Sequence, residues 1–183
     1  VIWTRFALDG RSIAKQKYHG LDGHDLGAKV AEHYNHLRKM GVRKIVINVD
    51  TGGVGASPVD WLRHNGYPVN AVNFGAGAVN TQRYKNLRAE MWGRMKEWIA
   101  QGGCLPQDSD LETDLTGVEY GYTPTNQILL EKKEDMKKRG MASPDNADAL
   151  ALTFAVRMNE YIDNPTPPAG RRRQEIRSRD PYR

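Results

Sequence analysis

The sequence predicts an α/β layered fold built around a mixed sheet, and three observations support this. A strand–turn–strand pattern opens the chain, strand and helix patterns then alternate to its end, and residues 42–49 are almost continuously apolar and β-branched after a basic start. Such a run is typical of a strand that helices cover on both faces. Alternation after a hairpin favours a mixed sheet flanked by helices. The length of 183 residues suits one domain with a tail.

Turn residues and hydrophobic periodicity divide the first half of the chain. Asp9-Gly10 is a hairpin-turn signal, and Gly41 can end a helix. The strand at 42–49 ends at Asp50, where a glycine-rich loop begins. The expected elements are strands at 1–8 and 12–18, a helix at 22–40, a strand at 42–49, a loop at 51–57, a helix at 58–65 and a strand at 67–74.

The second half contains the longest helical pattern. The expected elements are a helix at 80–100, an irregular acidic stretch at 105–125 with a short helix near 108–115, a strand at 127–131, a charged helical turn at 132–139 and a last helix from 143 to about 163. Ser143 is expected to cap the last helix, with Pro144 at its first position. We therefore expect one domain over 1–163, followed by a Pro-rich linker and a basic tail over 164–183.

Composition excludes several classes of protein. Charged residues are 27% and hydrophobic residues 39%, which is ordinary for a globular domain, and no apolar run has the length of a membrane span. The single cysteine, Cys104, excludes a disulfide framework and a cysteine-rich metal site, and it fits a reducing, cytoplasmic setting. We expect no membrane partner.

The net charge of +5 is concentrated in the tail. The last thirteen residues hold six arginines and two acids, so the rest of the chain, with 21 basic and 20 acidic residues, is nearly neutral. A basic tail of this kind either binds nucleic acid or a charged protein partner, or is simply a solvated end.

Familiar catalytic motifs are absent from the sequence. It has no G-x-x-x-x-G-K-[ST], no dinucleotide fingerprint, no H-E-x-x-H and no G-x-S-x-G. Cys104 has no histidine nearby in the sequence and is expected to be a free structural thiol. His33 and His36 lack acidic or cysteine partners at ligand spacing, and we expect them to be surface residues.

Three carboxylates remain as candidates for chemistry. Asp50 follows a buried strand, at the end where α/β sheets place their sites, although an aspartate there is also a common turn residue. Asp145 and Asp148 are three apart, so both project from one face of the last helix near its N-terminus. The alternative is that Asp145 caps the helix and Asp148 pairs with a lysine. Oxygen ligands without His or Cys favour Mg²⁺ or Mn²⁺, and such a set suits two ions that promote phosphodiester hydrolysis.

Several segments resemble the nuclease domain of phage large terminase subunits. These are residues 48–55 (NVDTGGVG), residues 86–92 (NLRAEMW), and residues 130–140 (LEKKEDMKKRG) followed by 143–154 (SPDNADALALTF). The last motif is also similar to Holliday-junction resolvases of the same superfamily. The resemblance extends to about residue 163.

The resemblance implies a ribonuclease H-like mixed central sheet flanked by helices, whose first central strand is missing or truncated here. In that family this strand carries the first catalytic aspartate, and Asp9 does not replace it because it lies in the hairpin turn. The implied catalytic and metal-binding residues are Asp50, Asp145 and Asp148, with Glu131 as an extra ligand and Lys132 near the site. Either of the last two could equally be a solvated side chain. The residues expected to contact DNA phosphates are Arg83, Lys85, Arg88 and Lys133.

The implied activity is cutting of concatemeric double-stranded DNA at the start and end of viral packaging, with two Mg²⁺ or Mn²⁺ ions. Implied partners are double-stranded DNA, the packaging ATPase domain of the same full-length chain, the portal and the small terminase subunit. The implied location is the host cytoplasm, transiently at the procapsid portal. Two alternatives stay open: a Holliday-junction resolvase-like nuclease, and a non-catalytic module that docks on DNA or the portal.

Overall fold

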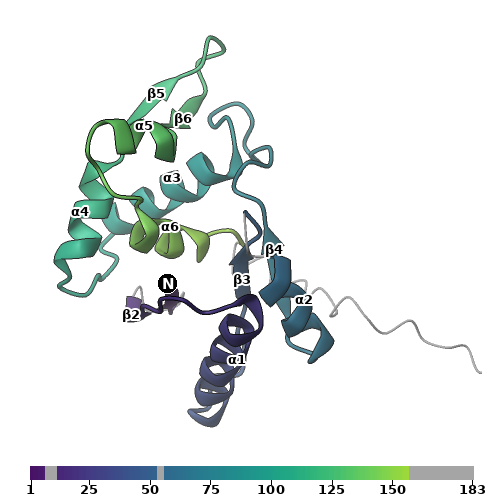
Figure 1. Ribbon diagram of the computed structural model, residues 1–183. Helices are drawn as coiled ribbons and strands as arrows, with labels where there is room; N and C mark the ends of the chain where they lie inside the picture. The colour runs from purple at the N-terminus through teal and green to yellow at the C-terminus, as the bar shows by residue number, and fades with distance from the viewer. Residues whose placement is uncertain (7–11, 53–55, 157–183) are drawn as a thin grey trace, which may run out of the picture.

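The computed structural model describes residues 1–6, 12–52 and 56–156. Strands and helices alternate after an opening hairpin, as the sequence predicts (Figure 1). In chain order the elements are β1 (Ile2–Arg5), β2 (Ser12–Gln16), α1 (Gly23–Lys39), β3 (Ile47–Asp50), α2 (Ala56–His64), β4 (Val69–Val72), α3 (Leu87–Ala100), α4 (Ser109–Gly117), β5 (Tyr120–Tyr122), β6 (Ile128–Leu130), α5 (Lys133–Lys138) and α6 (Asp145–Leu152). No helix in the described part is long and apolar enough to span a membrane.

The strands form both kinds of ladder that a mixed sheet needs. β1 and β2 are antiparallel, so the predicted hairpin is confirmed, although its expected turn at Asp9-Gly10 lies outside the described residues. β3 and β4 are parallel, and α2 connects them. β5 and β6 form a second antiparallel pair. Within the described ranges each ladder has two strands, and none is hydrogen-bonded to another as a continuous sheet.

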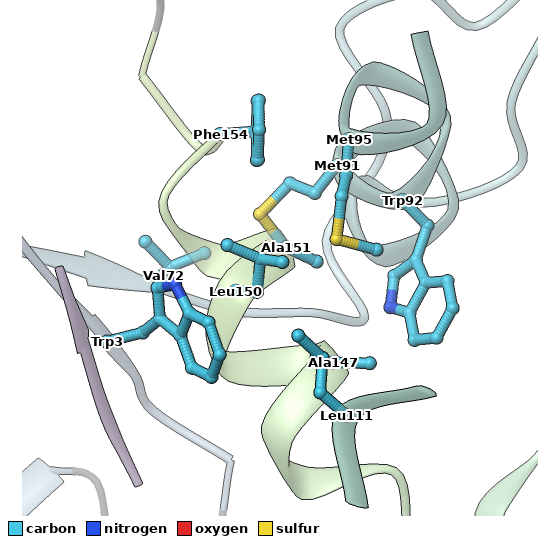
Figure 2. Packing of buried hydrophobic residues seen from close by; sticks show 10 residues of the cluster. All are labelled: Trp3, Val72, Met91, Trp92, Met95, Leu111, Ala147, Leu150, Ala151 and Phe154. Carbon is cyan, nitrogen blue, oxygen red and sulfur yellow. The ribbon is translucent and has the colours of Figure 1, made fainter. Parts of the chain in front are cut away.

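The main core surrounds α6. This short helix contacts α3 and α4 on one side and β1 and β3 on the other (Figure 1). Figure 2 shows Leu150 and Ala151 between the methionines of α3 and Trp3 of β1. Leu150, Ala151 and Ala147 are fully buried. Because its first turn is fixed by this core, α6 holds its acidic residues in defined positions.

A smaller core packs helices α1 and α2 against β3 and β4. Ala31, Ile47 and Leu62 are buried in it. Gly27 of α1 permits the close approach, because a Cβ there would lie 2.9 Å from the indole of Trp61. The sequence predicted helices on both faces of β3. This core covers one face with α1 and α2, and α6 also contacts the strand.

The first residues of two elements differ from the sequence prediction. β3 begins at Ile47 rather than at 42, because β4 begins opposite Ile47 and offers residues 42–46 no partner. α3 begins at Leu87 rather than 80, where the side chain of Asn86 accepts a hydrogen bond from the amide of Ala89. The buried carboxylate of Glu90 accepts hydrogen bonds from two amides of the preceding segment, which therefore folds as a turn.

Three further predictions about local structure were wrong. The stretch 105–125, expected to be a loop around one short helix, also contains β5, which is stabilised by pairing with β6. α6 ends at Leu152, and the part of its expected length beyond 156 lies outside the described residues, as does the tail at 164–183. Ser143 does not cap α6. Instead the carboxylate of Asp114 on α4 accepts hydrogen bonds from the amides of Asn146 and Ala147.

Candidate metal centre

The predicted carboxylates line one large cavity. It has a volume of about 1000 Å³ and runs between β1 and the segment 42–50, with α1 on one side and α6 on the other. Asp50, Asp145 and Asp148 all line it, together with Gly52 and Lys133. The fold therefore places Asp50 along the same cavity as two residues that are 95 and 98 positions away in the sequence.

Asp50 is the last residue of β3 and is half-buried. Its Oδ1 accepts a hydrogen bond of 3.0 Å from the amide of Gly52, which fixes the turn after the strand. Asp50 is thus a turn residue and a cavity-lining residue at once. The turn holds the carboxylate in place through Oδ1, and among the described residues no hydrogen bond involves its Oδ2.

Asp145 is the first residue of α6, and its side chain is 63% exposed. Its Oδ1 lies 3.5 Å from the ammonium of Lys133. Because Asp114 binds the amides of the first helical turn, Asp145 is not needed as a cap and its carboxylate is directed to the cavity. An exposed carboxylate with one long ion pair can exchange that partner for a cation at little cost.

Asp148 has a different environment, although it is on the same helix. Its side chain is only 6% exposed, and three groups donate to it. Arg88 Nε and Trp92 Nε1 each donate to Oδ1 at 2.9 Å, and Lys133 Nζ lies 3.1 Å from Oδ2. The pairing of Asp148 with a lysine, which was the alternative to a metal-binding role, is therefore present, with two more donors. A buried carboxylate needs such partners because an isolated buried charge is very costly.

Lys133 links the two aspartates of α6. It is half-exposed at the start of α5 and contacts both carboxylates. The donor set, carboxylate oxygens without sulfur or imidazole, suits a hard divalent cation such as Mg²⁺ or Mn²⁺. The ligand oxygens of Asp50, Asp145 and Asp148 are not all within 4.8 Å of one another among the described residues. An ion would have to draw the exposed Asp145 inward and compete with Lys133.

The two expected supporting residues lie outside the cavity lining. The carboxylate of Glu131 accepts hydrogen bonds from Arg139 and from the amide of Glu119. Burial opposes ionisation of Glu131, but these hydrogen bonds hold its pKa below the ordinary value. Lys132 is exposed and precedes α5. Its neighbour Lys133, which the sequence analysis assigned to DNA contact, is the lysine that reaches the carboxylates.

The basic residues expected to follow DNA do not share one exposed face. Arg83 is exposed but forms a 2.6 Å ion pair with Glu97, which raises its pKa. Lys85 is exposed and precedes α3. Arg88 is buried, because its guanidinium binds Asp148 and the carbonyl of Glu131. We expected Arg88 on the surface, and its burial shows that it belongs to the carboxylate cluster.

Sequence reasoning missed Trp92 as a functional residue and assigned it to the core. It does pack there, as Figure 2 shows, but its indole N–H also binds Asp148. The spacing of Arg88 and Trp92, four residues apart on a helix, puts both on one face and could have indicated a shared partner. His33 was also misplaced. It is half-buried and hydrogen-bonded to Thr4 Oγ1 at 2.6 Å.

Comparison with solved structures identifies the fold. The chain is similar to the nuclease domain of the large terminase subunit of bacterial virus Sf6. A mutant of that domain with manganese matches with a TM-score of 0.58 and 16% identity, covering 81% of this chain and 80% of the other. A mutant with calcium gives a TM-score of 0.57 and 16% identity over 81% and 78% of the two chains.

This chain has the fold of a terminase nuclease domain. The domain without a stated mutation also matches, with a TM-score of 0.53 and 15% identity over 74% of this chain and 71% of the other. No protein-family model and no curated protein matches the chain. These matches confirm the predicted ribonuclease H-like fold class. At 15% and 16% sequence identity they are evidence for the fold alone.

Proposed function

We propose that this chain is the metal-dependent endonuclease domain of a viral DNA-packaging motor, and that it cuts double-stranded DNA. The observation that carries the proposal is that Asp50 and Asp145 line a single cavity within the fold of a terminase nuclease domain. The similar Sf6 domain has been solved with manganese and with calcium. We therefore propose a divalent metal ion, bound by oxygen ligands, as the cofactor.

In the proposed site, Asp50 and Asp145 bind the cofactor directly. Two Mg²⁺ or Mn²⁺ ions would activate water and stabilise the leaving oxygen during phosphodiester hydrolysis. Asp50 is held by its turn with Gly52, and Asp145 is exposed and free to move toward an ion. Asp148 already has three donors, so we assign it to positioning Lys133 rather than to direct ligation.

The remaining parts of the proposal concern partners. Lys85 and Lys132 are exposed and are proposed to contact DNA phosphates, which needs no base specificity. The packaging ATPase domain of the same full-length chain, the portal and the small terminase subunit are the proposed protein partners. The proposed site of action is the host cytoplasm, transiently at the procapsid portal. We infer these from the terminase context of the structural neighbours.

The test compares two single variants, Asp50→Asn and Asp145→Asn, with Glu131→Gln as the matched control. All three remove one carboxylate charge, but Glu131 lies outside the cavity lining. We expect plasmid cutting with Mn²⁺ to fall at least a hundredfold in the first two and to be kept in the control. Calorimetric titration with Mn²⁺ gives a second readout, in which the first two variants should lose heat of binding. Cutting by Asp145→Asn at the unsubstituted rate would refute the proposal.

One observation favours the non-catalytic alternative. Lys133 bridges Asp145 and Asp148, and the three carboxylates are not gathered at ligand distance among the described residues. A module that only docks on DNA or the portal would show no Mn²⁺ binding and no cutting while it still retained duplex DNA. The same titration and cleavage assays therefore separate the two functions.

A further inference from the structure

We infer that Asp114 of α4 is a positioning residue of the candidate metal centre: it caps α6 from a neighbouring helix and so keeps the carboxylate of Asp145 available for a cation. The capping geometry lies within the described residues, and its consequence for a cation rests on the proposed function. Asp114 does not line the cavity, so it acts on the site through Asp145.

Two backbone amides at the start of α6 need an acceptor that water cannot supply. The first amides of a helix have no acceptor within it. In α6 two of them belong to Asn146 and Ala147, which are 4% and 0% exposed, and a buried amide without a partner destabilises the fold. Both amides donate to Asp114 Oδ2, at 2.8 and 3.3 Å. One carboxylate oxygen from another helix therefore satisfies both donors.

The carboxylate of Asp145 is left out of this turn. Pro144, which precedes α6, has no N–H to satisfy and provides no side-chain cap. The amide of Asp145 itself donates to the carbonyl of Ser143 at 2.8 Å. The amide of Asp148 donates to the carbonyl of Pro144, where the regular helical pattern begins. No amide of the first turn thus requires the side chain of Asp145, which is 63% exposed and forms its ion pair with Lys133.

The packing of α4 fixes the position of Asp114. Asp114 is three residues after Leu111, so both side chains lie on one face of α4. Leu111 is 1% exposed and belongs to the same core cluster as Ala147 (Figure 2). Asp108 caps α4 through the amide of Leu111 and forms an ion pair with Lys15 of β2. One apolar and one ionic contact thus hold α4 where Asp114 meets the first turn of α6.

Without Asp114, Asp145 would have two competing tasks. Carboxylates in the first turn of a helix are attracted to its free amides and to the positive end of its dipole. Asp145 is the first residue of α6, so its carboxylate can turn back to the amides that Asp114 now satisfies. A carboxylate oxygen that accepts those amides is withdrawn from the cavity. Asp114 therefore separates capping of α6 from cation binding, which Asp145 would otherwise have to combine.

A double-mutant cycle without metal tests the capping relation. The unsubstituted chain, Asp114→Ala, Asp145→Ala and the double variant are compared by their urea midpoints. Asp145→Ala should lower the midpoint more in the Asp114→Ala background than in the unsubstituted chain, because Asp145 has become the cap there. Additive losses would overturn the inference, since Asp145 would then not be the substitute cap. The cycle requires neither metal nor cutting, so its outcome is independent of the proposed nuclease activity.

Calorimetric titration with Mn²⁺ tests the consequence for a cation. Asp114→Asn keeps a side-chain oxygen that accepts amides, and Asp114→Ala does not. Affinity should fall about tenfold in Asp114→Ala, the factor that corresponds to a typical helix cap, and be largely kept in Asp114→Asn. The matched control is Asp22→Ala, which removes the cap of α1, a helix without any of the three carboxylates, and should leave the affinity unchanged.

A purely structural role of Asp114 gives a different result. The urea midpoint of Asp114→Ala would then fall while the folded variant bound Mn²⁺ as tightly as the unsubstituted chain, and this outcome would overturn the inference. If Asp114→Ala does not fold, Asp114→Ser, which shortens the side chain but keeps an acceptor, replaces it in both measurements. Absence of Mn²⁺ binding by the unsubstituted chain would refute the proposed function, and the metal-free cycle would still decide the capping relation.

Discussion

Arg88 and Asp148 form a buried ion pair, and separating them gives the sharpest test of the cluster. Their side chains are 11% and 6% exposed, and the Nε–Oδ1 distance is 2.9 Å. Removing one partner of a buried pair typically costs about 3–5 kcal/mol, because the other charge is left without compensation. Trp92 and Lys133 still donate to Asp148, so we expect Arg88→Met to cost about 3 kcal/mol, at the lower end.

The double variant Arg88→Met/Asp148→Leu removes both charges and should recover most of that loss. Replacing a buried pair by apolar side chains is often neutral or stabilising. The assay is urea denaturation of the unsubstituted chain, both single variants and the double variant, read as free energies of unfolding. If the two single losses simply add in the double variant, the residues are not coupled. That result, or a loss below about 1 kcal/mol for Arg88→Met, would refute the reasoning.

Three further outcomes follow from the structure. Burial, and secondly the charge of a neighbouring histidine, lowers the pKa of His33, so folding favours its neutral form. The free energy of unfolding should therefore fall as the pH drops below about 6.5, the pKa of histidine in the unfolded chain. Urea titrations at pH 7.5 and 5.5 should show a smaller fall for His33→Gln than for the unsubstituted chain. Gly93→Ala should destabilise by about 1–3 kcal/mol, because its Cβ would lie 2.2 Å from the Tyr84 hydroxyl, whereas Gly121→Ala, with open space, should change the melting temperature little. Lys133→Gln should tighten Mn²⁺ binding several-fold in calorimetry, since the ammonium competes for the same carboxylates, and unchanged affinity would show that it does not.

Local sequence signals predicted the elements that depend on local interactions. The helical periodicity of α1, the glycine at 41 that can end a helix and the β-branched run before Asp50 all led to correct elements. Boundaries set by distant partners could not be found in this way. β3 is short because of where β4 begins, and the first turn of α6 is capped by Asp114, which is 32 residues from Asn146.

The same contrast between local sequence signals and distant partners applies to the candidate site. The sequence by itself determined which acids could meet, because Asp50 ends a strand and Asp145 and Asp148 share one helix face. Only the tertiary structure decided that their roles differ: Asp148 is buried under Arg88 and Trp92, while Asp145 is left exposed. The physical reason is that burial and donor number depend on how α3 and α5 pack against α6. That packing cannot be read from the spacing of the acids along the chain.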